Sequence, residues 1–322
     1  MSRAPTRDHG GGLDAALAEY GGARGDWLDL STGINPTPYQ LPALEPSTWT
    51  DLPDAKAQAA LETAARSFWQ VPNRAEILAA NGASALIAMM PHLASGQTVS
   101  IPSPTYNEHA AAFAAQGWSV LPHLAPADVL VLVHPNNPDG KLWRAGNIDP
   151  SAYRLVVIDE SFCDVTPTHS LCNLAHHDNV VILKSFGKFW GLAGVRLGFA
   201  ISAPAIHARL KSLCGPWPVS GAALAIGAAA LNDDIWASVT RDRLAAASAR
   251  LDAIATAAGW QTVGGTDLFR LYETPDAAAA QNHLAKAKIL SRIFPYSKTW
   301  IRLGLPGSDQ AFARLQAALK SQ

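Results

Sequence analysis

Short apolar runs alternate with helical patterns over the first two thirds of the chain. Each run is about as long as a buried strand and consists mostly of Val, Ile, Leu and Ala. Strands are predicted at residues 77–80, 98–101, 119–121, 129–134, 155–158, 180–183 and 198–201. Helical spacing of the apolar residues predicts helices at 13–20, 55–69, 85–93 and 108–116. This alternation predicts an α/β fold, with a doubly wound, mostly parallel sheet sandwiched by helices.

The pattern changes after Pro216-Trp217-Pro218. A long helical region is predicted over 221–258, followed by the segment 262–272, a helix at 277–287 and a last strand at 300–305. These elements predict a smaller α+β domain. We therefore expect a large domain at 37–216, while the N-terminal arm 1–36 and residues 217–322 form the smaller part.

Composition narrows the class of protein. The chain has 322 residues, 48% of them hydrophobic, which is enough for a large core. Its net charge of −1 argues against nucleic acid or an anionic membrane as a partner, and no apolar run is long enough to span a bilayer. Three scattered cysteines, Cys163, Cys172 and Cys214, form neither a disulfide framework nor a CxxC metal pair. We expect a cytoplasmic protein without a metal.

Lys188 is the residue most suggestive of chemistry. It lies just after an apolar strand, in the small-residue run between Lys184 and Arg196. A lysine becomes a covalent catalyst when it is positioned, partly desolvated and near cations that lower its pKa, which Lys184 and Arg196 are expected to do. Ser185 and Arg196 suit a phosphate group. Pyridoxal 5'-phosphate (PLP) carries both an aldehyde, which could bind the amine, and a phosphate. The alternative is that Lys188 is an ordinary solvated surface lysine.

Polar residues follow other predicted strands. Asp159 is placed to pair with the pyridine nitrogen of such a cofactor, and Asn136 to donate to its phenolic oxygen, although a plain Asn-Pro turn explains Asn136 equally well. Tyr106 suits stacking on the ring, with an ordinary core or surface tyrosine as the alternative. The turn containing Ala83 and Ser84 opens a helix, where backbone N–H groups bind anions.

In this order, the motifs resemble the class I/II aminotransferase superfamily of fold type I PLP enzymes over about residues 30–305. The motifs that carry the resemblance are Asn81-Gly82-Ala83-Ser84, Pro104-Thr105-Tyr106, Asn136-Asn137-Pro138, Asp159-Glu160-Ser161-Phe162 and the loop 185–196. The resemblance implies that Lys188 forms the imine with PLP and that Ala83, Ser84, Ser185 and Arg196 hold its phosphate. It also implies that Asn136 and Asp159 fix the ring, on which Tyr106 stacks.

Within the superfamily, the chain is similar to the branch of histidinol-phosphate aminotransferases and cobalamin-pathway threonine-phosphate decarboxylases. The opening 9–12, the segment 29–36 and the run 300–303 resemble the decarboxylases. By this resemblance the substrate is a small phosphorylated amino acid, with Arg302 near its carboxylate, Arg292 at its phosphate, and His9 and Asn35 assisting.

Two departures from the family pattern bear on the reaction and the assembly. Phe162 stands where many transaminases of the branch have a tyrosine, which favours decarboxylation of L-threonine O-3-phosphate to (R)-1-amino-2-propanol O-2-phosphate. Leu52-Pro53 replaces a tyrosine-proline pair that often contacts the partner subunit, although the resemblance still implies a homodimer. A histidinol-phosphate-type aminotransferase is the alternative, and a non-catalytic PLP-binding domain is disfavoured because no basic N-terminal module is present.

Overall fold

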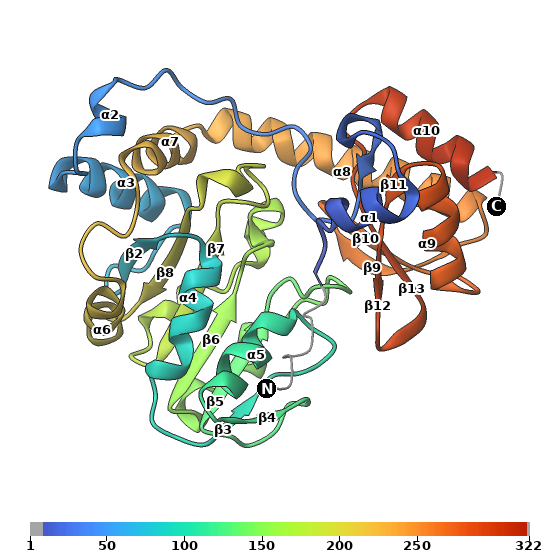
Figure 1. Ribbon diagram of the computed structural model, residues 1–322. Helices are drawn as coiled ribbons and strands as arrows, with labels where there is room; N and C mark the ends of the chain where they lie inside the picture. Colours follow the sequence, from blue (N-terminus) through green and yellow to red (C-terminus); the bar gives the residue numbers. More distant parts are fainter. Residues whose placement is uncertain (1–8, 321–322) are drawn as a thin grey trace. The chain divides into compact units, whose positions relative to one another are not determined.

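The computed structural model describes residues 9–320, and the chain divides into two compact units (Figure 1). Residues 38–240 form the first, called the large unit here. The described residues up to 37 and from 241 onward form the second, the small unit. The first boundary lies one residue from the predicted one, whereas the second lies at 240 instead of 216, because residues 217–240 pack with the large unit.

A seven-stranded sheet forms the centre of the large unit, in the order β2-β8-β7-β6-β5-β3-β4. The strands are β2 (Glu76–Ala80), β3 (Thr98–Ser100), β4 (Ser119–Leu121), β5 (Val129–Val133), β6 (Leu155–Asp159), β7 (Val180–Ser185) and β8 (Gly198–Ser202). Strands β4, β3, β5, β6 and β7 run parallel, while β8 pairs antiparallel with both β7 and β2. The predicted doubly wound, mostly parallel sheet is confirmed.

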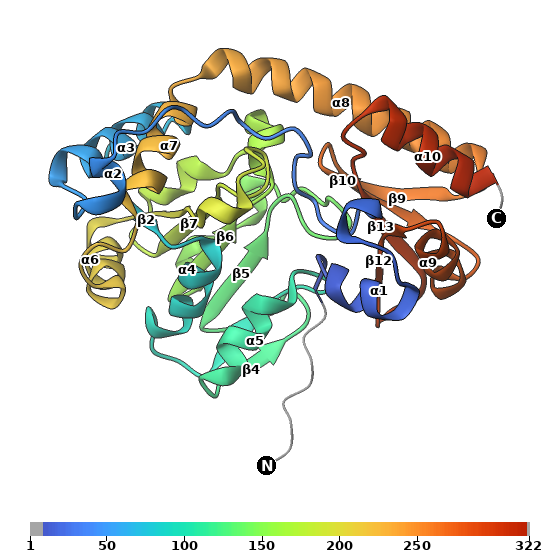
Figure 2. The same cartoon turned by 45° about the horizontal axis from the view of Figure 1, so that its top comes forward.

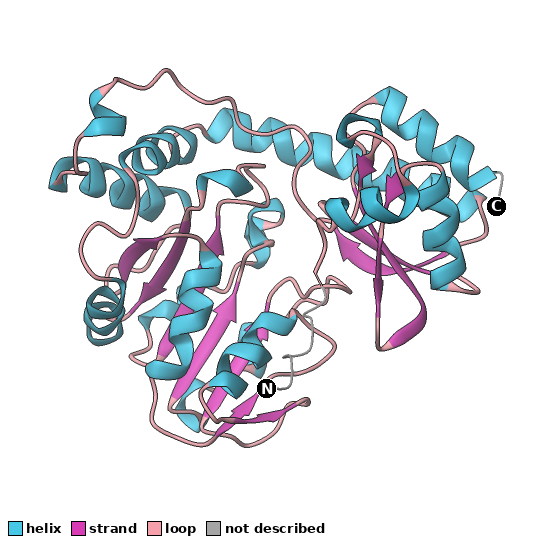
Figure 3. Cartoon of the chain, viewed as in Figure 1, coloured by secondary structure: helices cyan, strands magenta, loops and turns pink. Residues whose placement is uncertain are grey.

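Helices cover both faces of this sheet. The helices of the large unit are α2 (Ser47–Thr50), α3 (Ala55–Phe68), α4 (Ala83–Met89), α5 (Asn107–Ala115), α6 (Pro204–Cys214) and α7 (Gly221–Leu231). One face carries an apolar core that includes Val157 and Leu183, against which Leu86 of α4 and Phe113 of α5 pack. Figures 1 and 3 show α4 and α5 in front of the strands. Because side chains alternate along a strand, Asp159 and Ser185 belong to this same face.

The long helical region predicted over 221–258 is two helices. Helix α7 ends at Leu231 and α8 (Asp234–Ala257) begins after a two-residue break. Asp233 causes the break, because its side-chain oxygen accepts a hydrogen bond of 2.9 Å from the backbone N–H of Trp236 and so caps the new helix. Helix α8 is the long helix in Figure 2.

The small unit is built on an antiparallel sheet in the order β12-β13-β10-β9. Its strands are β9 (Gln261–Thr266), β10 (Phe269–Glu273), β12 (Arg292–Phe294) and β13 (Ser297–Gly304), and its other helices are α1 (Leu13–Tyr20), α9 (Ala277–Lys286) and α10 (Asp309–Lys320). A further pair, β1 (Leu28–Asp29) and β11 (Ile289–Leu290), is parallel. No helix within residues 9–320 is long and apolar enough to cross a membrane.

Candidate active site

A cavity of about 660 Å³, partly open to solvent, lies at the carboxyl ends of β6 and β7 in the large unit. Its lining includes seven of the eight residues that the sequence assigned to the cofactor: Ala83, Ser84, Tyr106, Asp159, Ser185, Lys188 and Arg196. Ligand sites of open α/β sheets lie at this edge, because the connecting loops meet there. Residues separated by more than 100 positions are thus brought to one site.

One end of the cavity is suited to a phosphate. Helix α4 begins at Ala83 after Gly82, and no side chain caps its first N–H groups. Gly82 has φ = +82°, and a Cβ atom there would lie 2.7 Å from Nη2 of Arg196, so the guanidinium lies close to the helix start. Gly198 brings β8 equally close, because its Cβ would lie 2.3 Å from the backbone nitrogen of Ala83. Backbone N–H groups and a guanidinium therefore converge on one point, which is typical of an anion site.

Asp159 at the end of β6 also lines the cavity and is held by two neighbours. His109 Nε2 lies 2.8 Å from its Oδ2, and Ser161 donates from both its backbone N–H and its hydroxyl to Oδ1. Burial by itself raises the pKa of the Asp159 carboxyl group, but the hydrogen bonds from His109 and Ser161 outweigh it, so the pKa lies below its ordinary value. A buried carboxylate that stays ionised suits a protonated pyridine nitrogen.

His109 and Ser161 were not predicted from the sequence. Ser161 follows Asp159 by two residues and is recognisable as a local turn partner. His109 is fully buried on α5, one turn after Tyr106. The sequence signal that could have indicated it is a polar residue on the face of a helix that packs against the core.

Lys188 is half-buried, and its Nζ lies 5.4 Å from the centroid of the Phe162 ring. It is positioned by the completely buried Phe189 and Trp190 that follow it. The expectation that Lys184 acts on this amine is wrong. Lys184 points to the opposite face of the sheet, where Glu160 lies 2.5 Å and Asp164 3.7 Å from its Nζ, so its charge is neutralised there.

Asn136 and its neighbour Asn137 lie in different surroundings. The side-chain NH₂ of Asn136 donates to Pro104 O and Asp139 Oδ1, at 3.0 and 2.7 Å, and its oxygen accepts from the Thr105 hydroxyl at 2.6 Å. The Asn136 side chain therefore holds the turn together and does not line the cavity. Asn137 does line it. The structure therefore places Asn137, rather than the predicted Asn136, at the cavity wall.

The two predicted substrate arginines lie in the small unit as direct cross-strand partners. Arg292 on β12 pairs with Arg302 on β13, which places both side chains on the same face of the sheet. Arg302 is buried, and its Nη2 donates to the carbonyl oxygen of Ser31 at 2.7 Å. Two like charges in such a pair repel each other, and an anionic ligand relieves that repulsion.

His9 and Asn35 also belong to the small unit. His9 is exposed, and the adjoining backbone is fixed because Gly11 donates its N–H to the hydroxyl of Ser31 at 2.7 Å. Asn35 is buried, and its side-chain oxygen accepts from Nη2 of Arg243 at 2.9 Å. Arg243 and Ser31 are polar neighbours that the sequence did not indicate.

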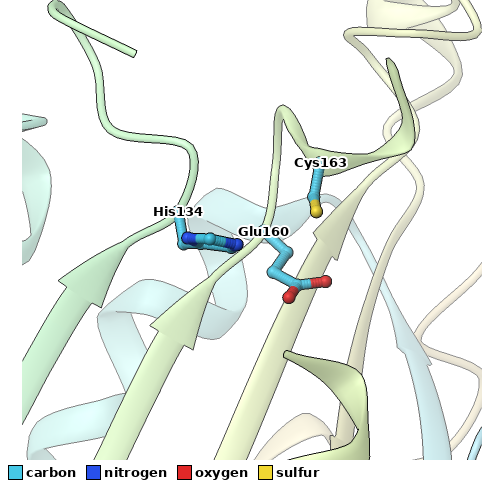
Figure 4. A group of neighbouring side chains, drawn as sticks. All are labelled: His134, Glu160 and Cys163. Atoms are coloured by element: carbon cyan, nitrogen blue, oxygen red, sulfur yellow. The ribbon is translucent and has the colours of Figure 1, made fainter. Parts of the chain in front are cut away.

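A second group of potential ligands, His134, Glu160 and Cys163, is buried on the other side of the sheet (Figure 4). The backbone N–H of Trp143 donates to Nδ1 of His134, and Nε2 lies 2.7 Å from His169 O, so neither ring nitrogen offers a lone pair to a metal. Burial raises the pKa of the Cys163 thiol well above its ordinary value. These three side chains are therefore not a metal centre.

Comparison with known proteins identifies the family. The chain matches the family described as aminotransferase class I and II over residues 25–124 and 121–319. It belongs to this family. Two relatives named threonine-phosphate decarboxylase, from Sinorhizobium sp and Pseudomonas aeruginosa, are 39% and 38% identical, and each alignment covers 97% of both chains.

A solved structure of histidinol-phosphate aminotransferase from Sinorhizobium meliloti, in complex with pyridoxal-5'-phosphate, has a TM-score of 0.82. Its sequence is 19% identical, and the alignment covers 100% of this chain and 98% of that chain. This likeness shows the fold. The fold class and the cofactor predicted from the sequence are confirmed. The donor set of the cavity fits PLP, because an amine, an ionised carboxylate and an anion site line the same cavity.

Proposed function

We propose that the protein is a PLP-dependent carboxy-lyase that converts L-threonine O-3-phosphate to (R)-1-amino-2-propanol O-2-phosphate and carbon dioxide, in cobalamin biosynthesis. The observation that carries this proposal is the 38–39% identity, over nearly the full length, to two proteins named threonine-phosphate decarboxylase. The cavity lined by Lys188 and Asp159 supports it chemically.

Several residues of the large unit are proposed to bind the cofactor. Lys188 would hold the cofactor at its aldehyde group, and Asp159 would keep a proton at the pyridine nitrogen. The phosphate is bound by Ser185, Arg196 and the N–H groups of Ala83 and Ser84. The arrangement of Gly82 and Gly198 supports this role, because it places a helix start and a guanidinium together. Tyr106 stacks on the ring, and Asn137 donates to its phenolic oxygen.

PLP, when bound, accepts the electron pair of the substrate bond that breaks. The protein must then orient the Cα–carboxylate bond, exclude water and return one proton to Cα. Lys188 is the proposed proton donor to Cα, because it is the amine that lines the cavity. Phe162 next to Lys188 provides an apolar wall without a phenol.

The proposed substrate carries a phosphate and a carboxylate. Arg292 is proposed to bind the phosphate and Arg302 to contact the carboxylate, with His9 and Asn35 assisting. The cross-strand pairing of the two arginines supports a substrate with more than one negative charge.

The test is incubation of the purified protein with PLP and L-threonine O-3-phosphate in the absence of any keto acid. Release of carbon dioxide and of the amino alcohol phosphate, detected by mass, is the expected result. Lys188→Ala is expected to lose turnover while keeping the circular dichroism of the fold. Turnover near the parent rate in this variant contradicts the proposal.

A histidinol-phosphate-type aminotransferase is the second candidate, because the fold is shared with such an enzyme. It predicts a product that appears only when a keto acid acceptor is supplied. The same incubation with histidinol phosphate and 2-oxoglutarate separates the two reactions.

We further propose that the protein is a homodimer and works in the cytoplasm. Four large apolar side chains of the large unit, Trp49, Leu52, Ile235 and Val239, are each more than 60% exposed. A partner subunit that covers them would remove this apolar surface from water. Light scattering during gel filtration is expected to give twice the chain mass of 34.0 kDa. A monomer that retains full activity contradicts the dimer.

A further inference from the structure

Strands β6 and β7 present different side chains to the two faces of the sheet at their carboxyl ends. Asp159 and Ser185 line the cavity of the candidate active site. Glu160 and Lys184 are adjacent to them in sequence and therefore point to the other face. The two strands are in register here, because Asp159 pairs with Leu183 and the N–H of Glu160 donates to Leu183 O at 2.8 Å.

On that other face, Glu160 and Lys184 form a buried ion pair. Lys184 Nζ lies 2.5 Å from Glu160 Oε2, and the side chains are 2% and 0% exposed. The Ser170 hydroxyl donates to Glu160 Oε2 at 2.7 Å, and the N–H of Leu171 donates to Oε1. Burial by itself lowers the pKa of the Lys184 ammonium, but Glu160 and Asp164 outweigh it and raise the pKa, so the ammonium stays charged.

The pair is extended by a second carboxylate. Asp164 lies 3.7 Å from Lys184 Nζ and accepts a hydrogen bond of 2.9 Å from the indole N–H of Trp69. The pair thus ties the ends of two strands to the loop 163–172 and to the end of α3. A buried ion pair is in general little better for stability than apolar residues of the same volume. Stability alone is therefore a weak reason for its presence.

The position of this pair suggests another role. Asp159 at the end of β6 and Ser185 at the end of β7 both line the cavity, and in the proposed roles they would hold the pyridine nitrogen and the phosphate of the cofactor. The spacing of those two strand ends would then set the orientation of the ring. A misplacement of about 1 Å in a reacting group lowers a rate about 100-fold. Glu160 and Lys184 are adjacent in sequence to Asp159 and Ser185. Their ion pair therefore joins the same two strand ends on the face of the sheet opposite the cavity.

We propose that Glu160 and Lys184 are positioning residues, whose buried ion pair holds Asp159 and Ser185 at the spacing that orients PLP. The inference rests on the proposed cofactor roles of Asp159 and Ser185. Neither Glu160 nor Lys184 lines the cavity, so both act through their neighbours.

The test is the triple variant in which Glu160→Gln/Lys184→Met is made together with Asp164→Asn, because Asp164 is the other carboxylate beside Lys184 Nζ and would otherwise be left as an unpaired buried charge. The control is Asp128→Asn/Arg154→Met. Asp128 and Arg154 form a more exposed ion pair of 3.1 Å directly before β5 and β6, at the amino ends of these strands and therefore at the edge of the sheet away from the cavity. Three properties are measured in both: the melting temperature, the dissociation constant of PLP, and the visible circular dichroism of the bound cofactor, which reports its orientation.

The triple variant is expected to melt within a few degrees of the parent, to bind PLP about 10-fold more weakly, and to show an altered cofactor circular dichroism. Its kcat is expected to fall by about 10- to 100-fold with little change in KM. Lys184→Arg keeps the charge pair with Glu160 and is expected to retain the PLP affinity of the parent. The control double variant is expected to match the parent in all cofactor properties.

Parent-like PLP affinity and circular dichroism in the triple variant overturn the inference and leave the proposed function intact. A parent protein that binds no PLP overturns the proposed function instead. Should the triple variant fail to fold, Glu160→Gln alone decides by the same cofactor measurements, because it is isosteric and leaves Lys184 beside Asp164.

Discussion

Replacement of His109 by Phe tests how the protein keeps Asp159 ionised. In the parent, His109 Nε2 lies 2.8 Å from Asp159 Oδ2, and the two side chains are 0% and 2% exposed. Phe has nearly the same shape and fills the same space on α5, but it offers no N–H. Asp159 keeps the two hydrogen bonds from Ser161 and loses its third.

The expected magnitude follows from the charge and the burial. A hydrogen bond to a charged group contributes about 1.5–3 kcal/mol. Since 1.4 kcal/mol corresponds to a factor of ten, the variant is expected to lose about 10- to 150-fold in kcat/KM, with weaker binding of PLP. The cause is a rise in the pKa of Asp159, which then holds a proton at the pyridine nitrogen less effectively.

The assays are titration of the apoprotein with PLP, followed by absorbance, and steady-state kinetics. His109→Gln keeps an N–H donor at a similar reach and is expected to retain more activity than His109→Phe. Phe113→Leu is the control. Phe113 is fully buried one turn further along α5, and its side chain has no group that could hydrogen-bond to Asp159. If His109→Phe binds PLP and turns over within about twofold of the parent, the reasoning about Asp159 is wrong.

Three further predictions follow from the geometry. Asn137→Ala is expected to weaken PLP binding about tenfold. Asn136→Ala is expected to keep the PLP affinity and to lower the free energy of unfolding by about 1–3 kcal/mol. If instead Asn136→Ala weakens PLP binding and Asn137→Ala does not, Asn136 is the residue that contacts the ring. Gly198→Ala is expected to lower both the melting temperature and PLP affinity because its Cβ meets backbone at 2.3 Å, while Gly194→Ala, with nothing within 4 Å, leaves both unchanged. Burial lowers the pKa of His134 below 6.5, so the unfolded chain binds a proton that the folded chain does not, and stability falls as the pH drops below about 6.5. His134→Gln is expected to flatten this dependence in urea unfolding at about pH 5.5 and 7.5, and an unchanged slope contradicts it.

Most of the fold of the large unit can be predicted from the sequence. The apolar runs at 129–134, 155–158 and 180–183 match β5, β6 and β7 closely, because strands buried on both faces are continuous apolar segments. The long segment 221–258 shows where the pattern is insufficient. Its helical spacing continues through the break, and the cap made by Asp233 is a local hydrogen bond that periodicity does not reveal.

The sequence by itself determined the fold class, the family motifs, the end of β6 at Asp159 and the position of Lys188 shortly after β7. Only the tertiary structure decided which neighbouring side chain faces the cavity. Asn137 and Asn136 differ by one position in a turn, and Lys184 is adjacent to Ser185, yet in each pair only one member lines the site. For Lys184 and Ser185 the physical reason is that adjacent residues of a strand point to opposite faces of the sheet. For Asn136 and Asn137 the reason is the hydrogen bonding of the turn, which ties the Asn136 side chain to Pro104, Thr105 and Asp139. His109 shows the converse, because a helix 50 residues upstream brings it against Asp159.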